Sequence, residues 1–87
     1  MNIYVSSSYI KSHRRLTKKN PQLVEKIKEK VSLFQIDPTY PSLRLHKLAG
    51  KEIEQWSISI SSNIRVVFQY TTDGILLTDI GSHDEVY

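Results

Sequence analysis

The hydrophobic pattern changes its period once along the chain, and this change constrains the fold more than any other feature. Between residues 9 and 36 the apolar side chains recur every three or four residues, which is typical of amphipathic helices. From residue 43 to residue 80 they alternate with polar side chains, which is typical of strands that bury one face. We therefore expect an α+β fold, with a helical pair packed on one face of a sheet.

Two helices are expected in the first part, after a short strand at residues 2–5. The first helix follows the serine run of residues 6–8, which offers N-cap candidates. It ends before Pro21, because proline disfavours helix at the residue before it. The second helix ends at Asp37-Pro38. Its apolar stripe consists of Leu23, Ile27, Val31 and Phe34.

Antiparallel strands are expected in the second part, at residues 42–48, 53–60, 64–71 and 75–80. Asp73-Gly74 is a strong hairpin signal between the last two. One sheet face would carry Trp56, Ile58, Ile60, Val66 and Phe68 into the core. The opposite, polar face would carry Arg44, His46, Ser57, Ser59, Arg65 and Gln69. A chain of 87 residues has room for one core, so we expect a single domain over residues 1–87, with an antiparallel sheet.

The composition argues against several classes of function. Without cysteine, the chain can form neither a disulfide framework nor a thiolate metal site, and a reducing compartment suits it. The histidines lack metal-ligand spacing, and no phosphate-binding glycine loop or serine-hydrolase elbow is present. No apolar run could span a bilayer or serve as a signal peptide. We expect a cytoplasmic protein that needs no metal or cofactor and contacts no membrane.

Positive charge is concentrated in the first third of the chain, although the net charge is only +3. The first acid is Glu25, and the basic residues that precede it are Lys11, Arg14, Arg15, Lys18 and Lys19. Such a segment suits a polyanion, because each neutralised phosphate releases counterions. The same side chains could equally form a solvated helix face or pair with the acidic C-terminal tail.

Two histidines and an arginine in the second part favour proton-transfer chemistry on RNA. Metal-independent cleavage needs a base for the 2′-hydroxyl, an acid for the departing 5′ oxygen and a cation for the transition state. His46 and His83 can fill the proton roles near neutral pH, and Arg65 can supply the charge. Either histidine could equally be structural, and Arg65 could pair with Asp79 across the sheet.

Three motifs follow one another in residues 46–87. They are H-x-L-x-G from His46 to Gly50, W-S-I-S-I followed by I-R-V-V-F, and the ending G-S-H-D-E-V-Y. In these motifs the chain resembles the RelE/ParE superfamily of toxins, with the YafQ-like mRNA interferases as the nearest branch. The resemblance implies a type II toxin that enters the ribosomal A site and cleaves mRNA, leaving a 2′,3′-cyclic phosphate. It also implies an antitoxin partner that blocks this activity within a hetero-oligomer.

The resemblance assigns roles to four residues. His83 matches the general acid, and His46 matches a base or phosphate ligand. Arg65 matches an arginine that stabilises transition-state charge, and Tyr87 matches an aromatic residue that orients or stacks a base. Residues expected to bind RNA or the ribosome are Lys11, Arg14, Arg15, Lys18, Lys19, Arg44, Lys47 and Lys51.

Two positions depart from the YafQ-like pattern, and they keep other functions open. Ser59 and Asn63 stand where YafQ-like members carry a histidine and an aspartate, so the identity of the base is open. One alternative is a ParE-like toxin that inhibits DNA gyrase, although the pair of His46 and His83 argues against it. Another is a non-catalytic RNA- or protein-binding module. For Tyr87, the alternative is simple packing on the helices.

Overall fold

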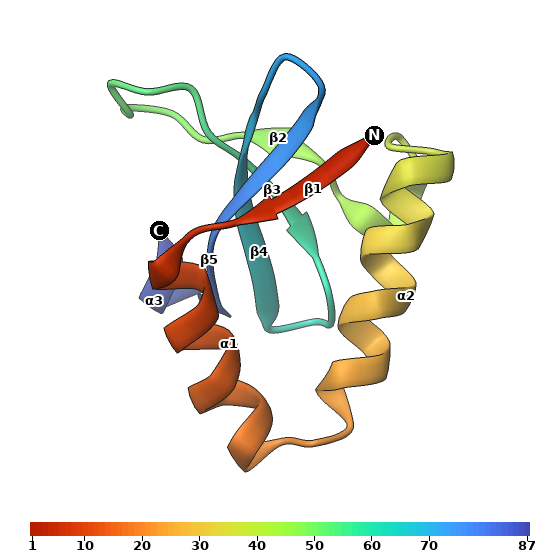
Figure 1. Ribbon diagram of the computed structural model, residues 1–87, viewed down its shortest axis with the longest axis vertical. Coiled ribbons are helices and arrows are strands. Elements are labelled where there is room, and N and C mark those ends of the chain that lie inside the picture. The colour runs from red at the N-terminus through yellow and green to blue at the C-terminus, as the bar shows by residue number, and fades with distance from the viewer.

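A five-stranded sheet carries two long helices on one face in the computed structural model, which describes residues 1–87 (Figure 1). In chain order the elements are β1 (Asn2–Val5), α1 (Ser7–Lys19), α2 (Leu23–Ile36), the 3₁₀ helix η1 (Pro41–Leu43), β2 (His46–Lys47), β3 (Trp56–Ser59), β4 (Ile64–Tyr70), β5 (Gly74–Ser82) and α3 (His83–Val86). This arrangement confirms the predicted α+β class. No helix is both long enough and apolar enough to cross a membrane.

Both long helices begin and end close to where the sequence predicts. The Ser6 hydroxyl accepts a hydrogen bond from the Tyr9 amide at 3.0 Å and caps α1. After α1 the Asn20 amide donates to the Leu16 carbonyl, and Pro21 follows. After α2 the Asp37 amide donates to the Leu33 carbonyl, at the predicted Asp-Pro stop.

The core lies between these helices and one face of the sheet. Its buried members are Tyr9, Leu23, Ile27, Phe34, Leu43, Ile58, Ile60, Ile64, Val66, Phe68, Ile75, Leu77 and Ile80. Trp56 packs against this cluster while staying partly exposed, as the alternation in β3 predicts. Both helices contribute side chains to the cluster, so they hold the sheet from a single side.

The sheet is mixed, which corrects the prediction of an antiparallel sheet. Strands β2 to β5 are antiparallel neighbours, but β1 pairs with β5 in parallel, in the order β1-β5-β4-β3-β2. The α1–α2 pair and the other strands separate β1 from β5 in the chain, so no turn signal reports their pairing. The parallel pairing of β1 with β5 goes together with the contact between α1 and β5, and no local sequence pattern indicates it.

The predicted strand at residues 42–48 is wrong over most of its length. Pro41 begins the 3₁₀ helix η1, and Leu43 is completely buried in the core. Arg44 then takes a left-handed conformation with φ 47°, which turns the chain sharply. Only His46 and Lys47 remain as strand, so β2 covers just one end of β3.

The C-terminal tail forms a short helix that the hydrophobic pattern does not predict. Strand β5 continues to Ser82, and α3 follows directly. Its start is a capping box: the Ser82 hydroxyl accepts from the Glu85 amide, and the Glu85 carboxylate accepts from the Ser82 amide. In Figure 1 the C-terminus lies behind the beginning of α1.

Candidate active site

A cleft of about 380 Å³ lies between the chain that follows β2 and the C-terminal tail. Its lining residues are His46, Lys47, Leu48, Ala49, Gly50, Lys51, His83 and Tyr87. Gly50 supports the turn on one side of the cleft with φ +74°, a conformation that glycine adopts readily. Three of the four residues predicted to be catalytic, His46, His83 and Tyr87, therefore line one cleft. His46 comes from β2, and the other two come from the C-terminal tail after β5.

The pairing of β2 with β3 places the His46 side chain. His46 lies opposite Ser57, and its Nδ1 is 3.4 Å from the Arg44 carbonyl oxygen and 3.5 Å from the Ser57 Oγ. When Nδ1 donates to that carbonyl, Nε2 keeps its lone pair. Nε2 lies 3.4 Å from the Tyr87 hydroxyl, at the cleft. In this tautomer Nε2 is a hydrogen-bond acceptor at the cleft.

The His83 side chain stands at the first position of α3, on the other side of Tyr87. The two ring centroids are 4.3 Å apart, and the rings meet edge to face. The Nδ1 atom of His83 is 3.7 Å from the Asp84 carboxylate, and both side chains are largely exposed. The His46 ring packs edge to face on Tyr87 as well, with centroids 5.7 Å apart. Tyr87 thus stands between the two histidine rings.

Tyr87 is anchored by Ser57, a residue that the sequence does not identify as part of the site. The two hydroxyls share a hydrogen bond, and Ser57 is completely buried. The predicted polar sheet face is therefore corrected at this point, because the tail covers Ser57. The Tyr87 ring packs against the rings of His46 and His83. The pairing of β2 with β3 could have pointed to Ser57, because a strand that contains His46 must place a β3 residue opposite it.

The capping box holds the tail in place. Hydrogen bonds from the Ser82 amide and hydroxyl hold the pKa of Glu85 below its ordinary value, and the positive charges of Arg15 and Lys19 act in the same direction. This effect places two cations of α1 beside α3. No ion pair joins these cations to the acidic tail, so the internal pairing considered for the basic segment is not formed.

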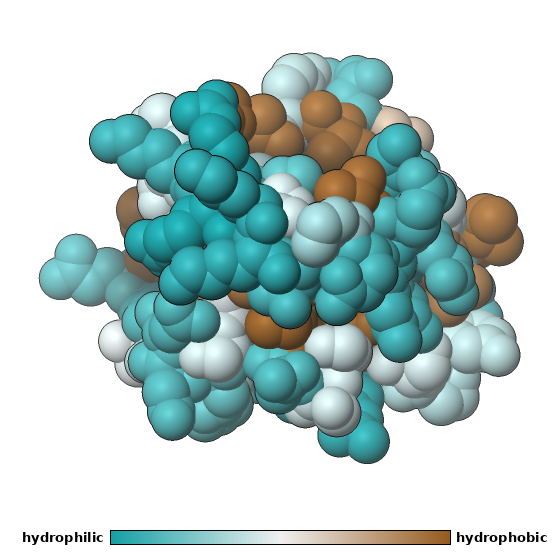
Figure 2. Space-filling model, turned by 90° about the horizontal axis from the view of Figure 1, so that it is seen from below, coloured by the Kyte–Doolittle hydropathy of each residue, from teal (hydrophilic) through white to brown (hydrophobic).

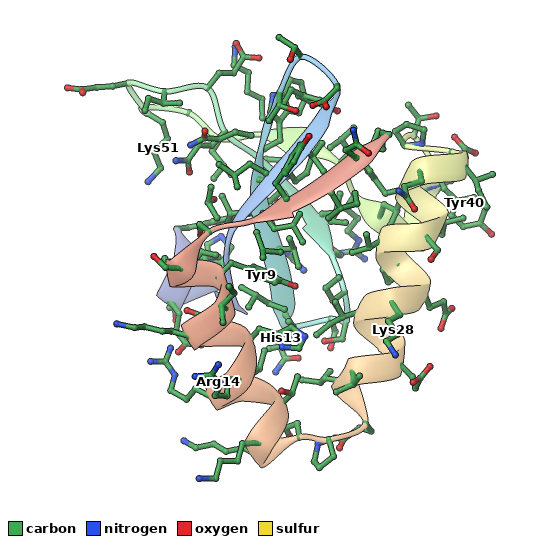
Figure 3. All side chains as sticks on the ribbon, viewed as in Figure 1. Tyr9, His13, Arg14, Lys28, Tyr40 and Lys51 are labelled. Carbon is green, nitrogen blue, oxygen red and sulfur yellow. The ribbon has the colours of Figure 1, made fainter.

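Arg65 lies outside the cleft that contains the histidines. It sits on β4 opposite Ser59 and Gly81, and its Nη1 donates to the Ser61 carbonyl oxygen at 3.3 Å. The proposed ion pair with Asp79 is not formed. The cations that line the cleft are Lys47 and Lys51. Lys47 also pairs with Glu54 at 3.4 Å, and Figure 3 shows Lys51 on the loop between β2 and β3.

The other predicted binding residues occupy two further surfaces. Lys11, Arg14, Arg15, Lys18 and Lys19 all lie on α1. Arg44 lines a separate pocket beside α2. The third histidine, His13, stacks on Tyr9 within α1, away from the cleft. Among residues 1–87, no three His, Asp or Glu side chains gather as a metal-binding group.

Comparison with known proteins gives matches in structure but none in sequence. No protein family and no curated protein matches the chain by sequence. YafQ from E. coli strain BL21(DE3) is similar with a TM-score of 0.81 and 15% identity, over 99% of this chain and 97% of that one. A YoeB/ParE toxin from Agrobacterium tumefaciens has a TM-score of 0.77 and 18% identity, over 95% and 99%. The chain has the RelE/ParE toxin fold.

A metal-bound toxin from Helicobacter pylori shares this RelE/ParE toxin fold, with a TM-score of 0.77 and 22% identity over 100% of this chain and 99% of that one. Two positions that depart from the YafQ-like pattern, Ser59 and Asn63, lie away from the histidine cleft. Ser59 is buried on β3, and Asn63 lies exposed in the turn before β4, where its carboxamide oxygen accepts from the Ser61 hydroxyl. Neither residue lines the histidine cleft, so neither stands ready as a base there.

Proposed function

We propose that this chain is the toxin of a type II toxin–antitoxin pair and a metal-independent endoribonuclease that cleaves mRNA on the ribosome. The observation that carries the proposal is the cluster of His46, Tyr87 and His83 in an open cleft. Two imidazoles separated by a phenol can serve the two sides of one phosphodiester. Arg65 makes its hydrogen bond elsewhere, so the proposal relies on Lys51 and Lys47 for positive charge.

The proposed reaction uses one proton acceptor and one proton donor. His46 Nε2 takes the proton of a ribose 2′-hydroxyl, and the 2′ oxygen attacks the adjacent phosphorus. The bond from phosphorus to the 5′ oxygen breaks, and His83 gives its proton to that oxygen. The products are a 2′,3′-cyclic phosphate and a 5′-hydroxyl, so no water or further reactant is consumed. The cations at the cleft stabilise the charge that develops on phosphate.

The proposed partners follow from the fold and from the charge. The E. coli protein YafQ forms a toxin–antitoxin complex with DinJ, which supports an antitoxin partner and a hetero-oligomer for this chain. Ribosome and mRNA are polyanions, and α1 offers five basic side chains to them. We propose that the protein acts in the cytoplasm, where ribosomes and mRNA are found.

The experiment that tests this proposal is controlled expression in a bacterial host, with mapping of transcript ends and a supercoiling assay. We expect growth arrest, new 5′-hydroxyl ends within translated mRNA, and unchanged plasmid supercoiling. Growth arrest with intact mRNA and relaxed or broken DNA would favour the gyrase inhibitor. Normal growth with intact mRNA would favour the non-catalytic binding module.

A further inference from the structure

A second pocket, of about 280 Å³, lies beside the open edge of β3 and is separate from the histidine cleft. It exists because β2 is only two residues long. Arg44 leaves the extended conformation with φ 47°, so nothing pairs with β3 at Ser59 on this side. Side chains from α2, η1 and the turn between β3 and β4 surround the gap.

The hydroxyl of Ser59 is the unusual feature of this pocket. Ser59 is only 6% exposed, and its buried Oγ has no hydrogen-bond partner. A buried polar atom without a partner costs about 1–3 kcal/mol, so native proteins rarely keep one without a reason. Ser42 and Ser62 also line the pocket, as does Ser61, whose hydroxyl already donates to the Asn63 carboxamide oxygen. The pocket therefore offers hydrogen-bond donors to a ligand.

Positive charge surrounds these hydroxyls. Lys26 and Lys30 lie one turn apart on α2, and Arg44, the residue after η1, lines the pocket with them. The Lys30 ammonium donates to the Ser42 hydroxyl at 3.2 Å, which places its charge at the pocket. None of the three cations forms an ion pair, and no acidic residue lines the pocket. The ligand that suits hydroxyl donors among unpaired cations is a phosphate group.

We propose that this pocket binds a backbone phosphate of the RNA, next to the one that is cleaved. The two sites are neighbours along the same two segments. Arg44 and Ser59 serve the pocket, and His46 and Ser57, two residues away on each segment, serve the histidine cluster. On β3, Ser57 and Ser59 are two residues apart, a span of about 7 Å that one nucleotide of an extended RNA strand can bridge. That the ligand is RNA rests on the proposed function, whereas the presence of a phosphate-binding pocket does not depend on it.

The test measures binding of a 2′-O-methyl RNA decamer, which cannot be cleaved, by fluorescence anisotropy. We expect Lys30→Gln and Arg44→Gln each to weaken binding about tenfold, the loss typical of a charged hydrogen bond. The double variant should lower the slope of log K against log salt by about 0.7, the value for one phosphate of a single strand. Lys28→Gln is the matched control: it removes the same charge from an exposed position of α2 that pairs with Glu25 (Figure 3).

Ser59→Ala separates a binding role from a structural one. The substitution removes a hydroxyl that has no partner, so the free energy of unfolding should stay the same or rise, while RNA binding weakens. Loss of stability with unchanged binding would overturn the inference. So would equal effects of Lys28→Gln and Lys30→Gln, or tighter binding of an acidic peptide than of the RNA.

Inorganic phosphate and the histidine variants distinguish failure of the pocket from failure of the proposed function. Titration with phosphate should shift the amide resonances of Ser59, Ser61 and Ser62 in the NMR spectrum. His46→Ala should leave these shifts in place. If wild type binds the decamer through Lys30 and Arg44 but cleaves no mRNA, the proposed nuclease fails and the phosphate pocket stands. If phosphate binds and the decamer does not, the assignment to RNA is overturned.

Discussion

At the scale of single residues, the Tyr87 hydroxyl contacts Ser57 and His46, which lie far from it in the sequence. It shares a hydrogen bond with the buried Ser57 and lies 3.4 Å from His46 Nε2. Its ring also packs against His83. The phenol therefore fixes the relative positions of both proposed proton carriers, even though it takes no part in the proposed proton transfers.

Tyr87→Phe should test this anchoring. The substitution leaves the buried Ser57 hydroxyl with only its 3.5 Å contact to His46, so unfolding in urea should show a loss of about 1–2 kcal/mol. The double variant Ser57→Ala with Tyr87→Phe should recover most of this loss, because no polar group is then left unpaired. Tyr40→Phe, at an exposed tyrosine, is the control and should change little. Equal stability of the two Phe variants would contradict the anchoring role.

At the scale of elements, β1 is attached to the sheet where β5 begins. Gly74 lies opposite Asn2, and an added Cβ would come within 1.8 Å of the Asn2 carbonyl oxygen. Close by, Asp73 accepts hydrogen bonds from the Asn2 carboxamide at 2.9 Å and the Tyr4 hydroxyl at 2.8 Å. The pairing of β1 with β5 thus depends on Gly74 and on the carboxylate of Asp73.

Gly74→Ala should loosen this edge. The Cβ meets backbone, which cannot rotate away as a side chain can, so we expect a loss of about 1–3 kcal/mol in the free energy of unfolding. Amide hydrogen exchange should become faster in β1 and stay slow in β3. Thr72→Ala, in the same turn, is the control. If amide exchange in β1 is equally fast in Gly74→Ala and Thr72→Ala, β1 tolerates the added methyl group and the prediction is wrong.

The short helix α3 should respond to acid. Bonds from Ser82 lower the pKa of Glu85 in the folded protein, so the folded state binds the proton less well than the unfolded state. The capped form is therefore fully stabilised above the ordinary value of 4.5 and loses this support as the pH falls through the lower folded pKa. NMR should show the Tyr87 ring signals broadening or moving in this range. Glu85→Gln should remove the transition, and a persisting transition would assign it to another group.

Local signals predicted much of the fold, and contacts between distant segments supplied the rest. Ser6 and Asp37-Pro38 marked the helix ends, and the alternation in Trp56–Ser59 marked β3. The strand at 42–48 failed because burial of Leu43 outweighed its alternating pattern. The S-x-x-E sequence of the capping box, at Ser82, could have revealed α3. No local pattern could show the pairing of Ser57 with Tyr87, which depends on how the tail folds back.

At the scale of the whole molecule, the charges form two basic regions outside the histidine cleft. One is α1, whose Arg15 and Lys19 lie beside the tail, and the other is the pocket with Lys30 and Arg44. The end of the molecule at which α1 and α2 meet is covered mostly by hydrophilic side chains (Figure 2). Under the proposed function, an RNA strand that reaches either basic region would meet positive charge there.

The most direct test of the nuclease is single-turnover cleavage of ribosome-bound mRNA by purified protein, with chemical analysis of the new 3′ ends. We predict 2′,3′-cyclic phosphate ends for the wild type and for His13→Gln, whose histidine lies outside the cleft. His46→Ala and His83→Ala should each be slower by about 10²–10⁴-fold, the usual contribution of a general acid or base. Cleavage at the wild-type rate by folded His83→Ala protein, or 3′ ends without a cyclic phosphate, would contradict the proposed mechanism.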